Sequence, residues 1–583
     1  MYKHQLILTG VLLGCFFSVA AQEDPNIGTE TVTVVKPYSP TVSDAFKIRP
    51  MPGLNDSIVL QKKEIEYKIY SIPVASTFTP AKGKASPVKK SEPEKLFNSY
   101  ASVGLGNFNN AEADLYTSWD IHRGNELLDL GLNHRSSRGD IESTLLDTDF
   151  YNTKLNASYS KRSSDLSWGA DIGLKHQLYN WYGLPEDVFD EATIATMDEQ
   201  QQYYSAEAGA YIDIEDAYFR RGELRYRRFW DGVDSGENRA ILGPSFRFPV
   251  NQESFDINAR IDYVGGNFSN ASVENIQNTP EINYGLLQAG ISPGLILERE
   301  GLSVNLGANI VYGLDTENDD SNFYIYPAVS ASYELLEESA IAYAGVEGGL
   351  DQNSYYDFVM ENPFVSPTLQ IQPTDRQYDA YVGVKGQLLS NVSYNIRGSY
   401  KAENRRPLFL LNPQNTFRND EKAYFYGNSF GIFYDDIKTL GLFGELNVTV
   451  NRNFSLGINA TVNDYNTETG NPAWNLPNLE GSLFLDYQIG KKWFFGSQLF
   501  YVGEREDLSR VAAQNVQPSE YPSLQVDLDS YFDANAHLGY RITEQFSLFV
   551  KGANLVNNQY QRWANFRVQS LQVLAGVTYK FDL

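Results

Sequence analysis

The stretch Leu166–Lys175, which reads LSWGADIGLK, decides the fold of this chain because its residue types alternate. Apolar side chains stand at every second position, and the positions between them hold serine, glycine, aspartate or lysine. Successive side chains of a β-strand point to opposite faces, so a period of two predicts a strand with one apolar and one polar face. This stretch is therefore predicted to lie in a sheet whose two faces meet different surroundings.

The same alternation continues in runs of about ten residues, from about Leu96 to Leu583. The final run places one apolar set opposite one polar set: Leu571, Val573, Ala575, Val577, Tyr579, Phe581 and Leu583 against Gln572, Thr578, Lys580 and Asp582. In water a second layer must cover the apolar face of such strands, whereas in a bilayer lipid covers it. We predict an all-β fold, a transmembrane antiparallel β-barrel; the alternative is a soluble all-β protein.

Composition agrees with a barrel and excludes a bundle of transmembrane helices. Aromatic residues make up 14% of the chain, and the mean hydropathy is -0.38. After the N-terminal leader, no run of about 18 apolar residues occurs. A chain of 583 residues usually divides into several globular domains, but a barrel turns its apolar face to lipid and keeps adding strands until the sheet closes.

The predicted connections alternate between short and long, which gives the barrel an orientation. Short polar turns are predicted at 122–125, 161–165, 451–453 and 543–545, and long loops at 181–202, 355–374, 405–422 and 504–521. Outer-membrane barrels have short periplasmic turns and longer external loops, so both chain ends are predicted to lie in the periplasm of a Gram-negative bacterium. Counting strands between these connections gives about 22, and the number must be even.

The first 21 residues are predicted to be a signal peptide. Lys3 and His4 precede the apolar run Leu6–Val19, and Ala20 and Ala21 supply a small-residue cleavage site. In the alternative, cleavage precedes Cys15, which would carry a lipid. If cleavage follows Ala21, the mature protein has no cysteine and hence no disulfide.

Residues 22–95 differ from the rest and are predicted to form an extended periplasmic segment ahead of a barrel at residues 96–583. The segment contains eight proline residues between Pro37 and Pro93 and a basic stretch that starts at Lys82. Proline-rich chains favour extended conformations, and this segment is too short for an independent domain of ordinary size.

One short run in this segment has the residue types of a strand that adds to the sheet of another protein. It consists of Glu30, Thr31, Val32, Thr33, Val34 and Val35. Main-chain hydrogen bonds supply affinity in such contacts, and alternating side chains set the register. The run resembles the TonB box of TonB-dependent receptors, which implies contact with TonB. The alternative is a strand used inside the protein.

Two regions of the predicted barrel resemble the same family. Residues 438–446 with 452–456 look like its late-barrel strand pair, and residues 552–560 with 577–581 look like its barrel end. The resemblance implies solute uptake or capture at the outer membrane. Members of the family carry a folded plug, but only about 60 residues separate Val35 from the predicted barrel, so the resemblance implies the barrel and not the complete transport machine.

A barrel of this size needs something in its lumen, because 16- to 18-stranded barrels already leave a channel. The lumen could be filled in three ways: by the N-terminal segment, with its lysines paired to lumen carboxylates; by a partner protein of the cell envelope; or by inward-folded loops. Two further hypotheses follow for the function, a plugless structural or accessory subunit of an outer-membrane complex and a passive porin.

The C-terminus and the loops offer further candidate sites. Tyr579, Phe581 and Leu583 resemble the terminal signal that the barrel assembly machinery recognises, although the usual last residue is phenylalanine; an ordinary lipid-facing strand is the alternative. Two acidic groups are candidate calcium sites: Asp315, Glu317, Asp319 and Asp320, and Glu186, Asp187 and Asp190. The preferred interpretation of both groups is that they are solvated loop carboxylates. Four aromatic residues are candidates for ligand stacking or interface anchoring: Trp181, Tyr182, Trp474 and Trp563.

No enzyme, cofactor or nucleic-acid function is predicted. The five histidines are scattered, and neither a His-Glu-x-x-His nor a Gly-x-Ser-x-Gly motif occurs. A formal net charge of -26 repels nucleic-acid phosphates. The expected partners are outer-membrane lipid, the barrel assembly machinery, TonB, and an envelope protein that fills the lumen.

Overall fold

The computed structural model describes residues 95–583 except 123, 139–140, 187, 216, 252, 270–280, 338, 418–421, 514–515 and 517. The chain divides into two units, residues 1–90 and 91–583, and all described residues belong to the second. The predicted signal peptide, residues 22–94 of the predicted extended segment 22–95 and the TonB-box-like run 30–35 lie outside the described residues.

Twenty-two of the described strands form one closed sheet in which every pairing is antiparallel. Their bounds are β1 Ser99–Gly106, β2 Ala111–Asp120, β3 Glu126–Ser137, β4 Phe150–Arg162, β5 Leu166–Asn180, β6 Gln200–Ile214, β7 Phe219–Asp231, β8 Gly236–Val250, β9 Glu253–Phe268, β10 Ile282–Arg299, β11 Leu302–Asp315, β12 Asp320–Leu336, β13 Ala340–Asp351, β14 Thr374–Leu389, β15 Val392–Leu411, β16 Phe430–Asn451, β17 Phe454–Thr467, β18 Leu479–Ile489, β19 Trp493–Val502, β22 Tyr531–Arg541, β23 Phe546–Ala553 and β26 Gln572–Phe581.

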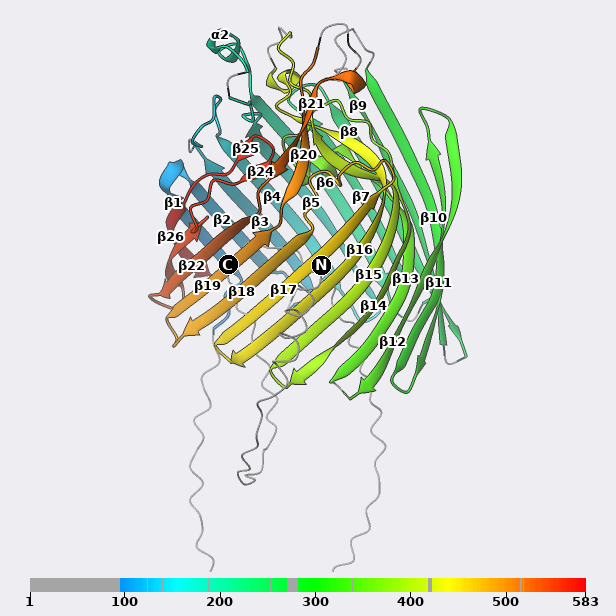
Figure 1. The fold of residues 1–583 in the computed structure, drawn as a ribbon. Helices are drawn as coiled ribbons and strands as arrows, with labels where there is room; N and C mark the ends of the chain where they lie inside the picture. Colours follow the sequence, from blue (N-terminus) through cyan, green and yellow to red (C-terminus); the bar gives the residue numbers. More distant parts are fainter. Residues whose placement is uncertain are drawn as a thin grey trace, which may run out of the picture. The chain divides into compact units, whose positions relative to one another are not determined.

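The last strand closes the barrel on the first. Strand β26 pairs with β1 in an unbroken register from Ser99 with Phe581 to Gly106 with Leu574. Closure leaves no unpaired edge, and Figure 1 shows the strands inclined around the barrel. The predicted fold class and the predicted strand number are both confirmed.

The two faces of the wall differ as the alternation predicts. Leu166, Trp168, Ile172 and Leu174 on β5 are exposed on the outer face, where lipid would cover them. The inner face carries ion pairs between neighbouring strands, such as Arg397 with Asp379, Arg376 with Asp351 and Arg247 with Asp256. The lumen is therefore polar and charged, while the outside is apolar.

Short turns gather at one end of the barrel and long loops at the other (Figure 1). The short β1–β2 connection contains η1 Asn107–Asn109. The long connections contain the remaining elements: α2 Glu191–Ile194, α3 Tyr355–Glu361, η2 Ala423–Tyr426, β20 Arg505–Arg510, η3 Pro518–Glu520, β21 Ser523–Leu528, β24 Gln561–Trp563 and β25 Phe566–Arg567. The predicted bounds of two loops are wrong: residues 200–202 of the loop 181–202 pair within β6, and residues 405–411 of the loop 405–422 belong to β15, so that this connection is 412–429. None of the helices in the described part is long and apolar enough to cross a membrane.

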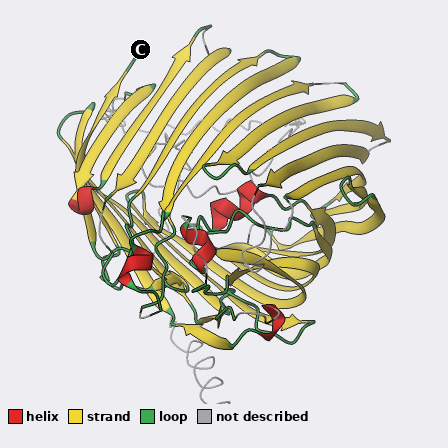
Figure 2. Ribbon diagram, turned by 90° about the horizontal axis from the view of Figure 1, so that it is seen from above, coloured by secondary structure: helices red, strands yellow, loops and turns green. Residues whose placement is uncertain are grey.

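Parts of the long connections fold inward, whereas α2 stands above the rim of the barrel (Figure 1). Viewed from the long-loop end, short helices and loops occupy the space inside the ring of strands (Figure 2). The largest buried hydrophobic cluster lies among them and includes Tyr203, Tyr355, Phe409, Phe430 and Phe566. The compact core of this unit is thus formed by loops and the inner ends of strands.

Candidate functional site

Five long connections pack together at one end of the lumen, and we call them the loop layer. They are residues 181–199, 352–373, 412–429, 503–530 and 554–571. Aromatic rings join them: Phe364 stacks on Phe566 with centroids 4.1 Å apart, and Tyr182 meets the edge of Phe566 at 4.9 Å. Buried aromatic pairs of this kind add stability beyond the area they remove from water. The loop layer is therefore a packed structure and not a set of independent loops.

The wall beneath the loop layer departs from the polar-inside pattern. At the long-loop ends of β6 to β10, inward positions hold buried apolar side chains, among them Tyr203, Phe229, Phe268 and Tyr284. Tyr355 of α3 packs on them, with ring centroids 4.9 Å from Phe268 and 5.1 Å from Phe229. The inner face of these strand ends is apolar because the loop layer covers it.

A buried carboxylate holds the N-terminus of α3 against the wall. Glu237 Oε2 accepts hydrogen bonds from the backbone N–H of Tyr355 at 2.6 Å and from the Tyr284 hydroxyl at 2.8 Å. The guanidinium of Arg227 lies 3.7 Å from Glu237 Oε1 and 3.7 Å from the ring centre of Tyr356. Unpaired N–H groups and the dipole at a helix N-terminus favour a negative charge, so this carboxylate stabilises the short helix and fixes its position.

Further polar contacts tie the same helix to β7, β8 and β9. Arg239 binds Asp262 through two hydrogen bonds of 2.9 Å and also reaches Asp357 of α3 at 3.0 Å. The Tyr355 hydroxyl donates to Asp231 at 2.8 Å. We call the complete set the α3 anchor: Arg227, Asp231, Glu237, Arg239, Asp262, Ser354, Tyr355 and Asp357.

Titration does not disturb the tyrosine of this anchor in the ordinary pH range. Burial and the charge of Asp231 raise the pKa of Tyr355 well above its ordinary value, so its hydroxyl stays protonated and donates. Burial also raises the pKa of Glu361 at the other end of α3, against the opposing charges of Arg406 and Arg562. The helix thus sits in a poorly solvated environment within the loop layer.

A second anchor holds the hairpin β20–β21. Asp507 is fully buried and accepts hydrogen bonds from the backbone N–H groups of Leu411 and Leu508 and from the amide of Asn475, at 2.8 to 3.1 Å. Burial raises its pKa to about 6. Arg505 donates to the backbone oxygen of Gln561 at 2.8 Å, which joins connection 503–530 to connection 554–571.

The aromatic residues that the sequence suggested for ligand stacking are not available for it. Trp181, Tyr182, Trp474 and Trp563 are all buried, and Trp181 is 0% exposed. Trp181, Tyr182 and Trp563 pack inside the loop layer, and Trp474 packs in a separate buried cluster with Leu408, Leu410 and Ile437, so both predicted roles, ligand stacking and interface anchoring, are wrong for them. The physical reason is that their loops fold inward, where apolar side chains find partners rather than solvent.

The acidic loop groups satisfy local backbone instead of forming a metal site. Asp315 accepts hydrogen bonds from the N–H groups of Glu317 and Asn318, and Asp190 caps α2 through Thr193. Asp187 lies outside the described residues. Among the residues that the structure describes, no three His, Cys, Asp or Glu side chains come close enough to hold a metal ion.

The C-terminal residues Tyr579 and Leu583 are exposed, and Tyr579 stacks on Phe581 with centroids 5.9 Å apart. Tyr579 and Phe581 lie on the closing strand β26, where an apolar outer face accounts for them, and Leu583 follows the end of that strand. Their role as an assembly signal stays a prediction.

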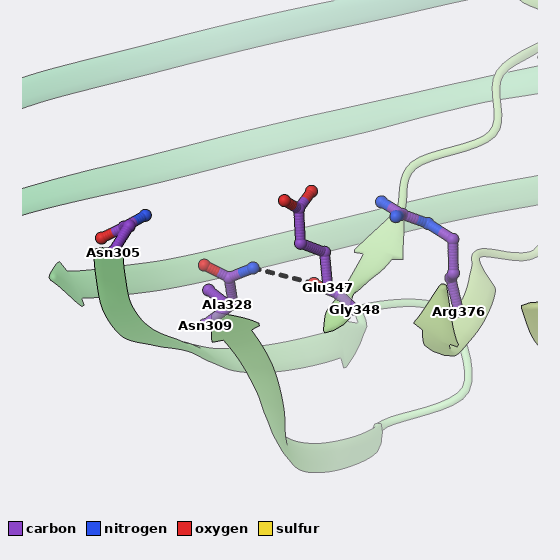
Figure 3. Close-up of a pocket in the computed structure, with 6 residues that line it drawn as sticks. All are labelled: Asn305, Asn309, Ala328, Glu347, Gly348 and Arg376. Carbon is purple, nitrogen blue, oxygen red and sulfur yellow. Dashed lines mark hydrogen bonds between the residues drawn. The ribbon is translucent and has the colours of Figure 1, made fainter. Parts of the chain in front are cut away.

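The lumen wall also contains a polar recess, shown in Figure 3. Its volume is about 270 Å³, and it is lined by Asn305, Asn309, Ala328, Glu347, Gly348 and Arg376. Asn309 donates to the backbone oxygen of Gly348 at 2.8 Å, Glu347 accepts from Tyr381, and Arg376 pairs with Asp351 at 3.0 Å. The recess therefore offers hydrogen-bond donors and acceptors, and side chains of both charges, to a small polar solute.

Comparison with solved structures identifies the architecture. The chain is 12% identical to the ferripyoverdine receptor of the Pseudomonas aeruginosa outer membrane, with a TM-score of 0.60 over 84% of this chain and 73% of that one. The siderophore receptor PirA of Acinetobacter baumannii gives 13% identity and a TM-score of 0.61, over 83% and 80%. The chain has the barrel fold of TonB-dependent siderophore receptors.

The ferric-catecholate import receptor Fiu of Escherichia coli agrees, with 11% identity and a TM-score of 0.55 over 83% of this chain and 82% of that one. No family model and no curated protein matches the sequence. The resemblance inferred from the sequence is thus confirmed at the level of the fold, which is that of a Gram-negative outer-membrane barrel. Sequence reasoning missed the α3 anchor, because Glu237 and Arg239 look like ordinary lumen-facing positions of an alternating strand.

Proposed function

We propose that this protein is an outer-membrane barrel that captures or takes up a solute, and that its loop layer closes the outer mouth of the lumen until it is displaced. The observation that carries the proposal is the packing of five long connections across one end of the lumen. In the proposed orientation the long loops face the exterior, and the short-turn end, where Ser99 pairs with Phe581, faces the periplasm.

The anchoring of the loop layer supports a gated barrel over a passive porin. A porin needs an open lumen, whereas here α3 is held against the wall by the buried carboxylate of Glu237 and by Arg239, which donates to Asp357. Hydrogen-bonded charges of this kind have a defined geometry and break as a unit, as a gate requires. The polar recess at Glu347 and Arg376 lies on the lumen wall and is suited to a polar solute.

Single-channel conductance in planar bilayers tests the closed mouth. We expect low conductance from the full chain and repeated open events from the variant Glu237→Ala, because the N-terminus of α3 loses its acceptor. Asp256→Ala, which removes an inward carboxylate near the short turns, is the matched control and should leave conductance low. Large, steady conductance from the unmodified chain would contradict the closed mouth.

TonB would supply the mechanical energy for displacement through residues 30–35. Val32→Pro removes a main-chain donor and should abolish crosslinking to TonB, whereas Val32→Ile keeps the donor and the β-branched side chain and should not. Crosslinking that is equal in both variants would contradict a TonB contact.

A structural or accessory subunit is the second candidate. The observation that favours it is the short stretch between Val35 and Ser99, about 60 residues, where receptors of this fold carry a plug. For an accessory subunit, Val32→Pro leaves both TonB crosslinking and cellular function unchanged. Deletion of the protein then destabilises a complex of envelope proteins and does not reduce solute uptake.

A further inference from the structure

Above its apolar belt, the outer wall carries an aromatic ladder near the long-loop end. His176 on β5 stacks on Tyr204 of β6 with ring centroids 4.3 Å apart, and Tyr204 stacks on Trp230 of β7 at 5.4 Å. Their register places them on the same face as the exposed Leu174, two residues before His176. Aromatic side chains on this face collect where lipid meets water, so the ladder marks the level of lipid headgroups.

A cavity adjoins the end of this ladder. Its volume is about 480 Å³, and it is lined by Arg228, Trp230, Asp231, Asp234, Ser235, Gly236 and Asn267. Gly236 lies opposite Trp230 on β8, and a Cβ atom there would stand 2.6 Å from Nη2 of Arg228. The glycine therefore lets the guanidinium lie against the neighbouring strand, which holds the charge at the cavity.

Arg228 faces outward, in contrast to its neighbour Arg227. It shares the outward face with the exposed Tyr226 and Leu224, at two-residue spacing on β7. Arg227 points inward to Glu237, whereas no described carboxylate forms an ion pair with Arg228. A cation at the lipid boundary is costly unless an anion lies close to it, and phosphate matches the planar fork of a guanidinium.

The other lining groups fit a sugar that carries this phosphate. The ring of Trp230 presents an apolar face for a sugar ring, and the amide of Asn267, which donates one hydrogen to Glu281 at 3.0 Å, supplies its second hydrogen and its oxygen. Asp234 is exposed at the rim, where it accepts from a sugar hydroxyl or amine. Asp231 is already occupied by Tyr355 and by the backbone N–H groups of its own turn.

We propose that this cavity binds the phosphorylated sugar headgroup of an outer-leaflet lipid. Arg228 holds the phosphate, Trp230 stacks on the sugar, and Asn267 and Asp234 bind its polar substituents. The volume lies within the range of ordinary small-ligand sites, which run from about 300 to 1,000 Å³. The proposal rests on the orientation given above, in which the long loops face the exterior.

Native mass spectrometry of the full chain in detergent, titrated with diphosphorylated lipid A, measures the binding. We expect a bound lipid that survives gentle activation and an apparent affinity about tenfold lower in Arg228→Gln, the loss of one charge-assisted pair. Trp230→Ala should also weaken binding. Arg225→Gln, on the same strand but facing the lumen beside Glu223, is the matched control and should bind as the unmodified chain does.

Competition separates the possible ligands. Dephosphorylated lipid A should bind about tenfold more weakly, and inorganic phosphate should fail to displace the lipid at equal concentration. Equal binding by Arg228→Gln and the unmodified chain overturns the proposal, as does displacement by inorganic phosphate, which would show a simple anion site. Heat-modifiable migration on gels confirms that each variant retains a folded barrel.

The orientation has its own test. Glu317→Cys introduces an exposed thiol in the β11–β12 loop at the long-loop end. A membrane-impermeant maleimide should label it in intact cells. Labelling only after lysis overturns the orientation and with it the lipid assignment, whereas labelling of intact cells together with unchanged lipid binding in Arg228→Gln overturns the lipid site alone.

Discussion

Glu237 on β8 accepts a 2.6 Å hydrogen bond from the backbone N–H of Tyr355, the first residue of α3. The same carboxylate oxygen accepts a hydrogen bond from the hydroxyl of Tyr284 on β10. One buried side chain thus joins two strands of the wall to a helix that lies more than a hundred residues further along the chain. The position of α3 is therefore a property of the wall as much as of its own loop.

Replacement of Glu237 by Gln should loosen α3 while preserving the barrel. The two carboxylate oxygens receive donors from Tyr355, Tyr284 and Tyr356, and an amide offers only one oxygen and turns its NH₂ toward other donors. We expect the free energy of local opening to fall by about 2 kcal/mol, the cost of unpaired buried donors. Hydrogen exchange at the amides of α3 measures the change, and unchanged protection would contradict the anchor.

Arg239 and Asp357 should be energetically coupled, but weakly. Their ion pair is 3.0 Å long, and the Asp357 side chain is 44% exposed, so solvent screens it. A double-mutant cycle of Arg239→Ala and Asp357→Ala should give a coupling of about 0.5–1 kcal/mol in the opening of α3. Arg239→Ala alone should cost more than Asp357→Ala, because it also removes two hydrogen bonds from the buried Asp262.

The control for this cycle is Arg247 with Asp256, a pair of inward side chains near the short turns. Its removal should leave exchange in α3 unchanged. A coupling of zero between Arg239 and Asp357 would show that α3 is held by packing alone, through residues such as Phe358 and Val359.

The wall could be predicted from the sequence because one physical rule governs it. Leu174 and Ile172 face lipid and their neighbours face the lumen, as a period of two requires. The alternation of short and long connections gave the number of strands and the long-loop end. Phe229 and Tyr284 also follow the alternation, but they face inward and are apolar. Inward positions of an open barrel face water, so the rule does not predict apolar side chains there.

The candidate site could not be predicted because it depends on contacts between distant loops. Tyr355 meets Asp231, 124 residues away, and the hairpin β20–β21 meets Leu411, 96 residues away. No local pattern encodes such convergence. A weak signal was present: Trp181 and Trp563 are large apolar residues in long loops, and such residues indicate that a loop has a packing partner.

The second anchor should make the loop layer more stable at low pH. Burial raises the pKa of Asp507 from 3.8 to about 6, so the closed hairpin binds a proton more tightly than the open one. Stability against local opening is therefore greatest below pH 3.8, falls as the pH rises from 3.8 to about 6, and is level above that. Protection of the β20–β21 amides, corrected for intrinsic exchange, should be higher at pH 4.5 than at pH 7.

Two variants isolate the responsible group. Asp507→Asn removes the titration and should abolish this slope, whereas Glu506→Gln, which neutralises the adjacent carboxylate on the other face of β20, should preserve it. Protection that increases with pH across the same window in the unmodified chain would contradict the assignment to Asp507.

Substitution of Gly576 by Ala should weaken the seam that closes the barrel. Gly576 on β26 lies opposite Gly104 on β1, and a Cβ atom at Gly576 would collide with the ring of Phe549 and with the backbone oxygen of Val103. The ring has some freedom to move, but the backbone oxygen belongs to the seam itself, so we expect a loss of about 1–3 kcal/mol. Gly444→Ala on β16 is the control, because no atom lies within 4 Å of a Cβ there. Urea titration followed by heat-modifiable migration on gels should show a lower midpoint for Gly576→Ala only. Equal midpoints would mean that the strands at the seam separate enough to admit a methyl group, and that closure depends on the register of β1 and β26 rather than on close approach at this pair.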